Sequence, residues 1–183
     1  MMDWNHLAEQ AVALGAFKAG VIPISDVSFE RSFRDMCESN ACGNYGRCWM
    51  CPPNVGNIDT LMDQARSYDR VLVYQTVSPL EDSYDFESMM AAAHRHSLLS
   101  RQLDQLCARE APADYLHLGA GGCHVCVTCA KVTGEPCRHP DLAMASLEAY
   151  GVNVSELAAA SGMKYINGQN TVTYFGAVLF KER

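Results

Sequence analysis

Residues 119–140 read GAGGCHVCVTCAKVTGEPCRHP and bring four cysteines into one short stretch. Cys123, Cys126 and Cys129 form a C-x2-C-x2-C run, and Cys137 follows after seven further residues. Three thiolates at this spacing can converge from one turn of chain, and a fourth can return from a short loop to complete a four-sulfur cage. Cages of this kind ligate cubane iron–sulfur clusters. A four-cysteine zinc site is the alternative, although zinc sites typically pair two C-x2-C knuckles.

Three glycines stand before this run, at Gly119, Gly121 and Gly122. Glycine tolerates positive φ angles and close backbone approach, so these positions would let amide N–H groups point at the sulfurs of a cluster. An ordinary strand-to-loop turn would use the same glycines. Because the segment has neither a G-K-[ST] ending nor G-x-G-x-x-G spacing, the pattern excludes a phosphate-binding loop.

A second cysteine group lies in residues 33–56, FRDMCESNACGNYGRCWMCPPNVG. Four, five and two residues separate Cys37, Cys42, Cys48 and Cys51. The segment is rich in Gly, Asn and Pro, so we expect a long irregular loop that a bound metal orders. The spacing is irregular for both a cubane and a zinc knuckle. An iron–sulfur cluster, zinc, and free or redox-active thiols therefore all stay open for this group.

The pair Cys51-Pro52 resembles the end of a ferredoxin cysteine run, where proline fixes the turn after the last ligand. In ferredoxins with two clusters, this distal ligand serves the other cluster. Cys51 and Cys137 could be exchanged between the two groups in the same way. Tyr45 and Trp49 are expected to be hydrophobic cover that keeps water off the ligands.

The nine cysteines of this 183-residue chain require an explanation. The N-terminus, MMDWNHLAEQ, has no basic region followed by an apolar one, so neither a secretory signal nor a disulfide framework is expected. We therefore expect a cytoplasmic protein, in which a cysteine cluster more often indicates metal or redox chemistry.

Composition argues against several other classes of protein. The net charge of −7 and the lack of a basic cluster argue against nucleic-acid binding. The longest apolar runs fall well short of the roughly 20 residues that a membrane span needs. The sequence also contains no G-x-S-x-G elbow, H-E-x-x-H pair or Walker loop.

Hydrophobic periodicity predicts a single α+β domain over residues 1–183. Helices are expected at residues 3–14, 57–68, 85–110, 142–150 and 154–160, and strands at residues 17–29, 70–77, 115–118 and 171–180. Pro23 lacks a ladder donor and suggests an edge strand. These elements predict one central mixed sheet of about four or five strands, flanked by helices, with both cysteine groups in loops outside it.

The longest expected helix carries two features that bear on metal binding. His94 and His96 are two residues apart and cannot share one helix face, which argues against a paired histidine site. Cys107 continues the apolar stripe and is expected to be an inert buried thiol.

The chain resembles, over nearly its whole length, a family of small bacterial and archaeal predicted metal-binding proteins of unknown function. The resemblance rests on CGNYGRCWMCPP, GAGGCHVCVTCAKVTGEPCRHP, MASLEAYGVNVSEL and TYFGAVLF. It implies cysteine ligands for iron–sulfur clusters and supplies no reaction. Carried over to this chain, it implies one ligand group of Cys37, Cys42, Cys48 and Cys51 and another of Cys123, Cys126, Cys129 and Cys137.

The sequence therefore predicts one or two [4Fe-4S] clusters in an electron-transfer or reductive-activation partner of a redox protein. A cubane with four cysteine ligands has no open iron, which favours electron transfer over catalysis. Zinc at the N-terminal cysteine group is the alternative cofactor, and a non-redox binding module or a redox sensor is the alternative function. Enzymatic activity stays open, because His124 and His139 could replace a ligand or donate a proton, or could be plain loop histidines.

Overall fold

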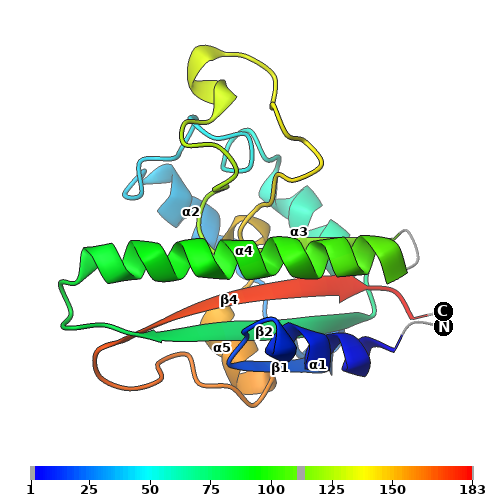
Figure 1. The fold of residues 1–183 in the computed structure, drawn as a ribbon. Helices are drawn as coiled ribbons and strands as arrows, with labels where there is room; N and C mark the ends of the chain where they lie inside the picture. Colours follow the sequence, from blue (N-terminus) through cyan, green and yellow to red (C-terminus); the bar gives the residue numbers. More distant parts are fainter. Residues whose placement is uncertain (1–2, 111–113, 183) are drawn as a thin grey trace.

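The computed structural model describes residues 3–110 and 114–182, and Figure 1 shows their arrangement. The strands are β1 (Lys18–Pro23), β2 (Arg70–Pro79), β3 (Tyr115–Leu118) and β4 (Thr171–Phe180). The α-helices are α1 (Trp4–Ala13), α2 (Ser32–Glu38), α3 (Ile58–Arg66), α4 (Phe86–Glu110) and α5 (Val154–Ala160). Three short 3-10 helices complete the set: η1 (Ile24–Asp26), η2 (Ala130–Thr133) and η3 (Glu148–Tyr150).

The four strands form one sheet in the order β1-β2-β4-β3. The predicted α+β class is confirmed, but the three strand pairings are all antiparallel, whereas a mixed sheet was expected. β2 and β4 occupy the centre and pair from Arg70 opposite Phe180 to Pro79 opposite Thr171. β1 lies at one edge, as Pro23 predicts, because an edge strand does not need the missing N–H donor.

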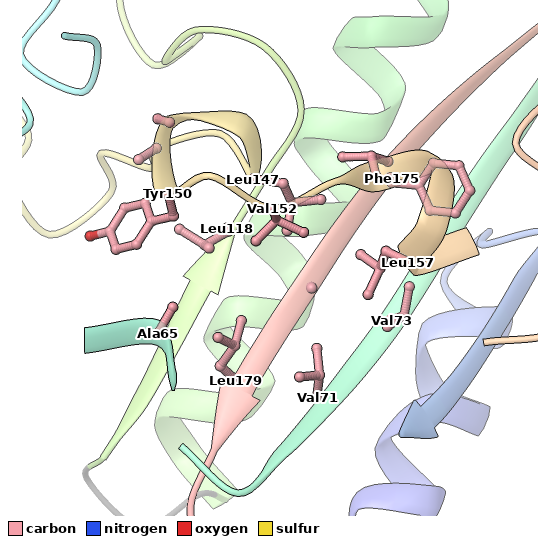
Figure 2. Close-up of a cluster of buried hydrophobic side chains, with 14 of the residues drawn as sticks. Ala65, Val71, Val73, Leu118, Leu147, Tyr150, Val152, Leu157, Phe175 and Leu179 are labelled. Atoms are coloured by element: carbon pink, nitrogen blue, oxygen red, sulfur yellow. The ribbon is translucent and has the colours of Figure 1, made fainter. Parts of the chain in front are cut away.

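Helices cover both faces of this sheet, and successive residues of β2 point to opposite faces (Figure 1). Leu72 and Tyr74 pack with α1 and α4 on one face. Val71 and Val73 pack with α3 and α5 on the other face, where Figure 2 shows them near Leu157. The near-continuous burial of β2 follows from these two layers.

The predicted helix ends agree with the observed ones to within about two residues at four helices. Side-chain oxygens of Asp3, Asn57 and Asn153 accept hydrogen bonds from free N–H groups in the first turns of α1, α3 and α5. None of the helices in residues 3–110 and 114–182 is both long enough and apolar enough to cross a membrane.

The predicted helix at residues 142–150 is wrong, because only the 3-10 turn η3 forms there. Backbone groups of this segment form hydrogen bonds with Gly119 instead of completing an α-helix. Gly119 N–H donates to the Ala145 carbonyl at 2.8 Å, and Leu147 N–H donates to the Gly119 carbonyl at 3.0 Å. This pairing continues the line of β3 and competes with helical hydrogen bonds, so a long-range contact overrides the local helical pattern.

Two further predictions near the N-terminus are corrected. The strand expected at residues 17–29 ends at Pro23, where η1 begins. The segment expected to be an irregular loop begins instead with helix α2, which contains Cys37. Arg34 of this helix donates to the carbonyls of Gly56 and Ala149 at 2.8 and 3.3 Å, and so holds α2 against its neighbours.

Candidate metal centre

Both cysteine segments gather on the same side of the molecule, beyond the sheet and above α4 in the view of Figure 1. The first group contains Cys37, Cys42, Cys48 and Cys51, and the second contains Cys123, Cys126, Cys129 and Cys137. All eight belong to the free cysteines of the structure.

The structure places one cysteine of the first group, Cys48, next to the cysteines of the second group. A hollow of about 20 Å³ is lined by Cys48 together with all four cysteines of the second group. Spacing in the sequence gave no indication of this neighbour. The two predicted sets of four therefore adjoin at Cys48, whereas the exchange raised from the sequence concerned Cys51 and Cys137.

Cys48 is the buried member of this assembly. The thiols of Cys51 and Cys129 and the backbone N–H groups of Met50 and Cys123 lie close enough to its sulfur to lower its pKa. The Cys51 contact has the largest effect, and together the donors lower the pKa of Cys48 to about 5 despite burial. The same hydrogen bond and burial raise the pKa of Cys51. Hydrogen-bond donors around a sulfur favour the thiolate, which is the form that binds a metal.

The second group receives backbone donors as well. N–H groups of Val125 and Met144 donate to the sulfur of Cys123, although burial raises the pKa of this thiol. Donors aimed at sulfur stabilise negative charge on thiolates, and hydrogen bonds to sulfur tune the potential of an iron–sulfur cluster.

Cys37 and Cys42 lie toward the outer side of the assembly. Burial raises the pKa of Cys37, the Arg34 guanidinium opposes this, and the neighbouring Cys42 adds to it. The charges of both cysteines also act on Cys51. Cys37, Cys42 and Cys48 are therefore each close enough to Cys51 to act on its pKa.

The two cysteine segments are tied together by Trp49. Its indole Nε1 donates to the Glu135 carbonyl at 2.9 Å, and Lys131 Nζ lies 4.4 Å from its ring centroid. Trp49 also lines the cysteine hollow. Its predicted role as hydrophobic cover agrees with this position.

The glycines before the second group act in two different ways. Only Gly121 of the three adopts the expected positive φ, at 68°. Gly122 permits close approach instead, because a Cβ there would lie 3.1 Å from Asn44 Nδ2 and 3.7 Å from Cys51 Sγ. A Cβ at Gly119 would meet Met144 Sδ at 3.0 Å.

Cys107 and His124 lie apart from the cysteine hollow, whereas His139 lies at its rim. Cys107 is buried in the apolar layer under α4, as predicted, and burial raises its pKa to about 12. His139 lines the cysteine hollow, whereas His124 lines a different cavity. Within the described residues, no three His, Cys, Asp or Glu side chains are arranged to hold a single metal ion.

Sequence reasoning missed a buried polar network below the cysteine segments. The Tyr74 hydroxyl lies 2.7 Å from both Ser100 Oγ and His117 Nε2. His117 Nδ1 lies 3.1 Å from Asp104 Oδ1, and Ser100 Oγ donates to the His96 carbonyl at 3.0 Å. The one available signal was His117 between two leucines of a predicted strand, since a buried polar side chain needs partners.

We expect Tyr74→Phe to destabilise the protein by about 2 kcal/mol, because it leaves His117 Nε2 buried without its partner. The melting temperature should fall by roughly 4–8 °C in a chain of this size. Thermal melts followed by circular dichroism measure the change. Tyr174→Phe is the matched control, because its hydroxyl makes a single bond to the half-buried Met89 carbonyl and its loss should cost less than about 1 kcal/mol. Equal losses in both variants would contradict the network.

The protein is therefore an α+β scaffold that holds two cysteine groups side by side. The chain belongs to the family described as predicted metal-binding protein (DUF2284), whose model matches residues 20–180. No curated protein and no solved structure matches the chain.

Proposed function

We propose that the protein binds one or two [4Fe-4S] clusters through its two cysteine groups and transfers electrons to a redox partner protein. The observation that carries this proposal is the hollow lined by Cys48 and the whole second group. A structural zinc site and a [4Fe-4S] cluster each take four thiolates, so Cys48, the fifth thiol at the hollow, would belong to an adjoining centre. The C-x2-C-x2-C spacing of Cys123, Cys126 and Cys129 favours a cubane over zinc at the second group.

The donor set fits such a cluster. It consists of soft thiolates, which suit iron–sulfur clusters as well as zinc. Backbone N–H groups already point at Cys48 and Cys123. We assign Cys123, Cys126, Cys129 and Cys137 to one cluster, and Cys37, Cys42, Cys48 and Cys51 to the second site, which zinc could occupy instead.

Contact between the two groups supports electron transfer. Cys48 contacts Cys51 of its own group and Cys129 of the other, so centres bound at the two groups would lie side by side. A bound cluster would supply one-electron redox chemistry. Val127, between Cys126 and Cys129, exposes its apolar side chain fully and offers a contact for a redox partner close to the cluster. We place the protein in the cytoplasm, where groups of cysteines more often hold a metal than form disulfides.

Metal analysis of protein purified without oxygen tests the proposal. We expect about eight iron and eight sulfide per chain for two cubanes, or about four of each with one group left for zinc. A reversible one-electron couple in voltammetry should accompany the iron. Zinc without sulfide would overturn the proposal and indicate a metal-stapled binding module. Iron without a reversible couple would remove the electron-transfer role.

A further inference from the structure

A second cavity, of about 230 Å³, lies beside the cysteine hollow and is separate from it. One wall is α4, and the opposite wall is formed by the loop at residues 119–125 and by side chains of residues 142–145. Cys123 lines both the cavity and the hollow. The cavity is larger than the roughly 150 Å³ that suffices to hold benzene in an engineered protein core.

His96 presents an unpaired nitrogen in this cavity. The side chain is only 3% exposed, and its Nδ1 lies 2.8 Å from Thr76 Oγ1. Its Nε2 is buried and has no hydrogen-bond partner in the described part of the chain. Burial lowers the pKa of His96 to about 4, so the ring is neutral at pH 7. The backbone of Phe175 also acts on the ring and opposes this shift of the pKa, and a hydrogen-bonding group in the cavity that His96 lines would give Nε2 the partner that a buried ring nitrogen normally has.

Arg101 supplies positive charge to the same cavity. It lies five residues after His96 on α4, which corresponds to roughly 7.5 Å along the helix axis. One of its five N–H donors is used by the His124 carbonyl, at 2.9 Å. Across residues 3–110 and 114–182, Arg101 has no ion pair, and the described residues that line the cavity include no Asp or Glu. In a chain with a net charge of −7, such a lining favours an anion.

The rest of the lining is largely apolar. It includes the side chains of Ala93, Val125, Leu142 and Met144. An occupant must therefore combine an apolar body with a negative group for Arg101 and a separate hydrogen-bonding group for the His96 nitrogen. Pockets with apolar walls and a few well-placed polar groups are typical of small-molecule sites.

We propose that this cavity binds a small organic monocarboxylate, with its carboxylate on Arg101, its apolar body between α4 and the 119–125 loop, and a hydroxyl-type group on His96 Nε2. The site goes beyond the proposed cluster function and does not depend on which metal the cysteines hold. Arg101 and His96 act as binding residues, and the spacing between them selects the length of the ligand.

Calorimetric titration of the full chain, purified without oxygen and with its own metal, tests the site with three probes. 4-Hydroxybenzoate carries a carboxylate and a hydroxyl at opposite ends of an apolar ring, benzoate lacks the hydroxyl, and phenol lacks the carboxylate. We expect 4-hydroxybenzoate to bind best. Benzoate should bind about tenfold more weakly and phenol at least about tenfold more weakly, because each of these two probes lacks one of the hydrogen-bonding groups.

Two variants assign the ends of the ligand. Arg101→Gln should abolish the preference for 4-hydroxybenzoate over phenol, and His96→Phe should abolish its preference over benzoate. The matched controls are Arg95→Gln and His94→Phe, on exposed positions of the same helix that do not line the cavity, and both should bind like the unmodified protein. Ala93→Leu should weaken all three probes by filling the cavity.

Several results would overturn the site. One is the absence of binding heat for 4-hydroxybenzoate up to a concentration of about 1 mM, which would leave water as the occupant. Another is equal binding of the three probes. A third is an unchanged preference in Arg101→Gln. If His96→Phe does not fold, the comparison of benzoate with 4-hydroxybenzoate in the unmodified protein still tests whether the cavity binds the hydroxyl group. Failure of the cluster proposal would appear in the iron and sulfide content instead, so the two failures are distinguishable.

Discussion

Replacing Cys129 by Ser is expected to remove about four iron and four sulfide per chain, the content of one cubane. Cys129 lines the cysteine hollow, and its thiol contacts Cys48. A serine hydroxyl stays protonated near neutral pH and does not replace a thiolate as a ligand of iron. Iron and sulfide assays on protein purified without oxygen measure the loss, together with the visible absorption of the cluster.

Cys107→Ala is the matched control for this experiment. The Cys107 thiol is fully buried in the apolar layer under α4, and its raised pKa keeps it protonated. The variant should keep its iron and sulfide, although the smaller side chain will reduce stability modestly. If Cys129→Ser kept full metal content, or if Cys107→Ala lost as much as Cys129→Ser, the ligand assignment would be wrong.

Gly176→Ala is expected to destabilise the fold by about 3 kcal/mol or more, through overpacking at the centre of the sheet. Gly176 on β4 lies opposite Tyr74 on β2. A Cβ at this position would overlap the phenol of Tyr74, with Cε2 at 2.8 Å and Cζ and the hydroxyl oxygen closer still. Tyr74 cannot move away easily, because it is fully buried and holds hydrogen bonds to Ser100 and His117.

Chemical denaturation and thermal melts measure this effect, with an expected fall in melting temperature of roughly 6–12 °C. Gly20→Ala is the control, because Gly20 lies on the edge strand β1 and a Cβ there would meet nothing within 4 Å. Its effect should stay within about 0.5 kcal/mol. A loss of stability at Gly20 equal to that at Gly176 would show that glycine in a strand matters here for its backbone and not for the space beside Tyr74.

Local patterns were sufficient for most of the scaffold. β2 and β4 were recognisable because their central residues are apolar on both faces and face helices on both sides. Helices α1, α3 and α5 were recognisable because apolar residues recur along them at helical spacing, and the structure adds their side-chain caps. These signals lie within a few residues of the element that they specify.

Local patterns gave the wrong element where backbone groups form hydrogen bonds with a distant segment of the chain. Residues 142–150 have a helical pattern, but Ala145 and Leu147 exchange hydrogen bonds with Gly119 instead. Helix propensity is worth only a few tenths of a kcal/mol per residue, roughly, so tertiary hydrogen bonds and burial easily override it. The antiparallel pairing of the sheet likewise depends on which strands meet, and no single strand shows this.

The sequence by itself determined that eight cysteines form two groups, that Cys107 stands apart from them, and that an α+β scaffold carries both groups. These features follow from residue type and spacing along the chain. Only the tertiary structure placed Cys48 against the second group, joined Tyr74 to His117 and left the His96 nitrogen unpaired in a cavity with Arg101. These features depend on how separate helices, strands and loops pack against one another. Residue type and spacing along the chain therefore cannot show them.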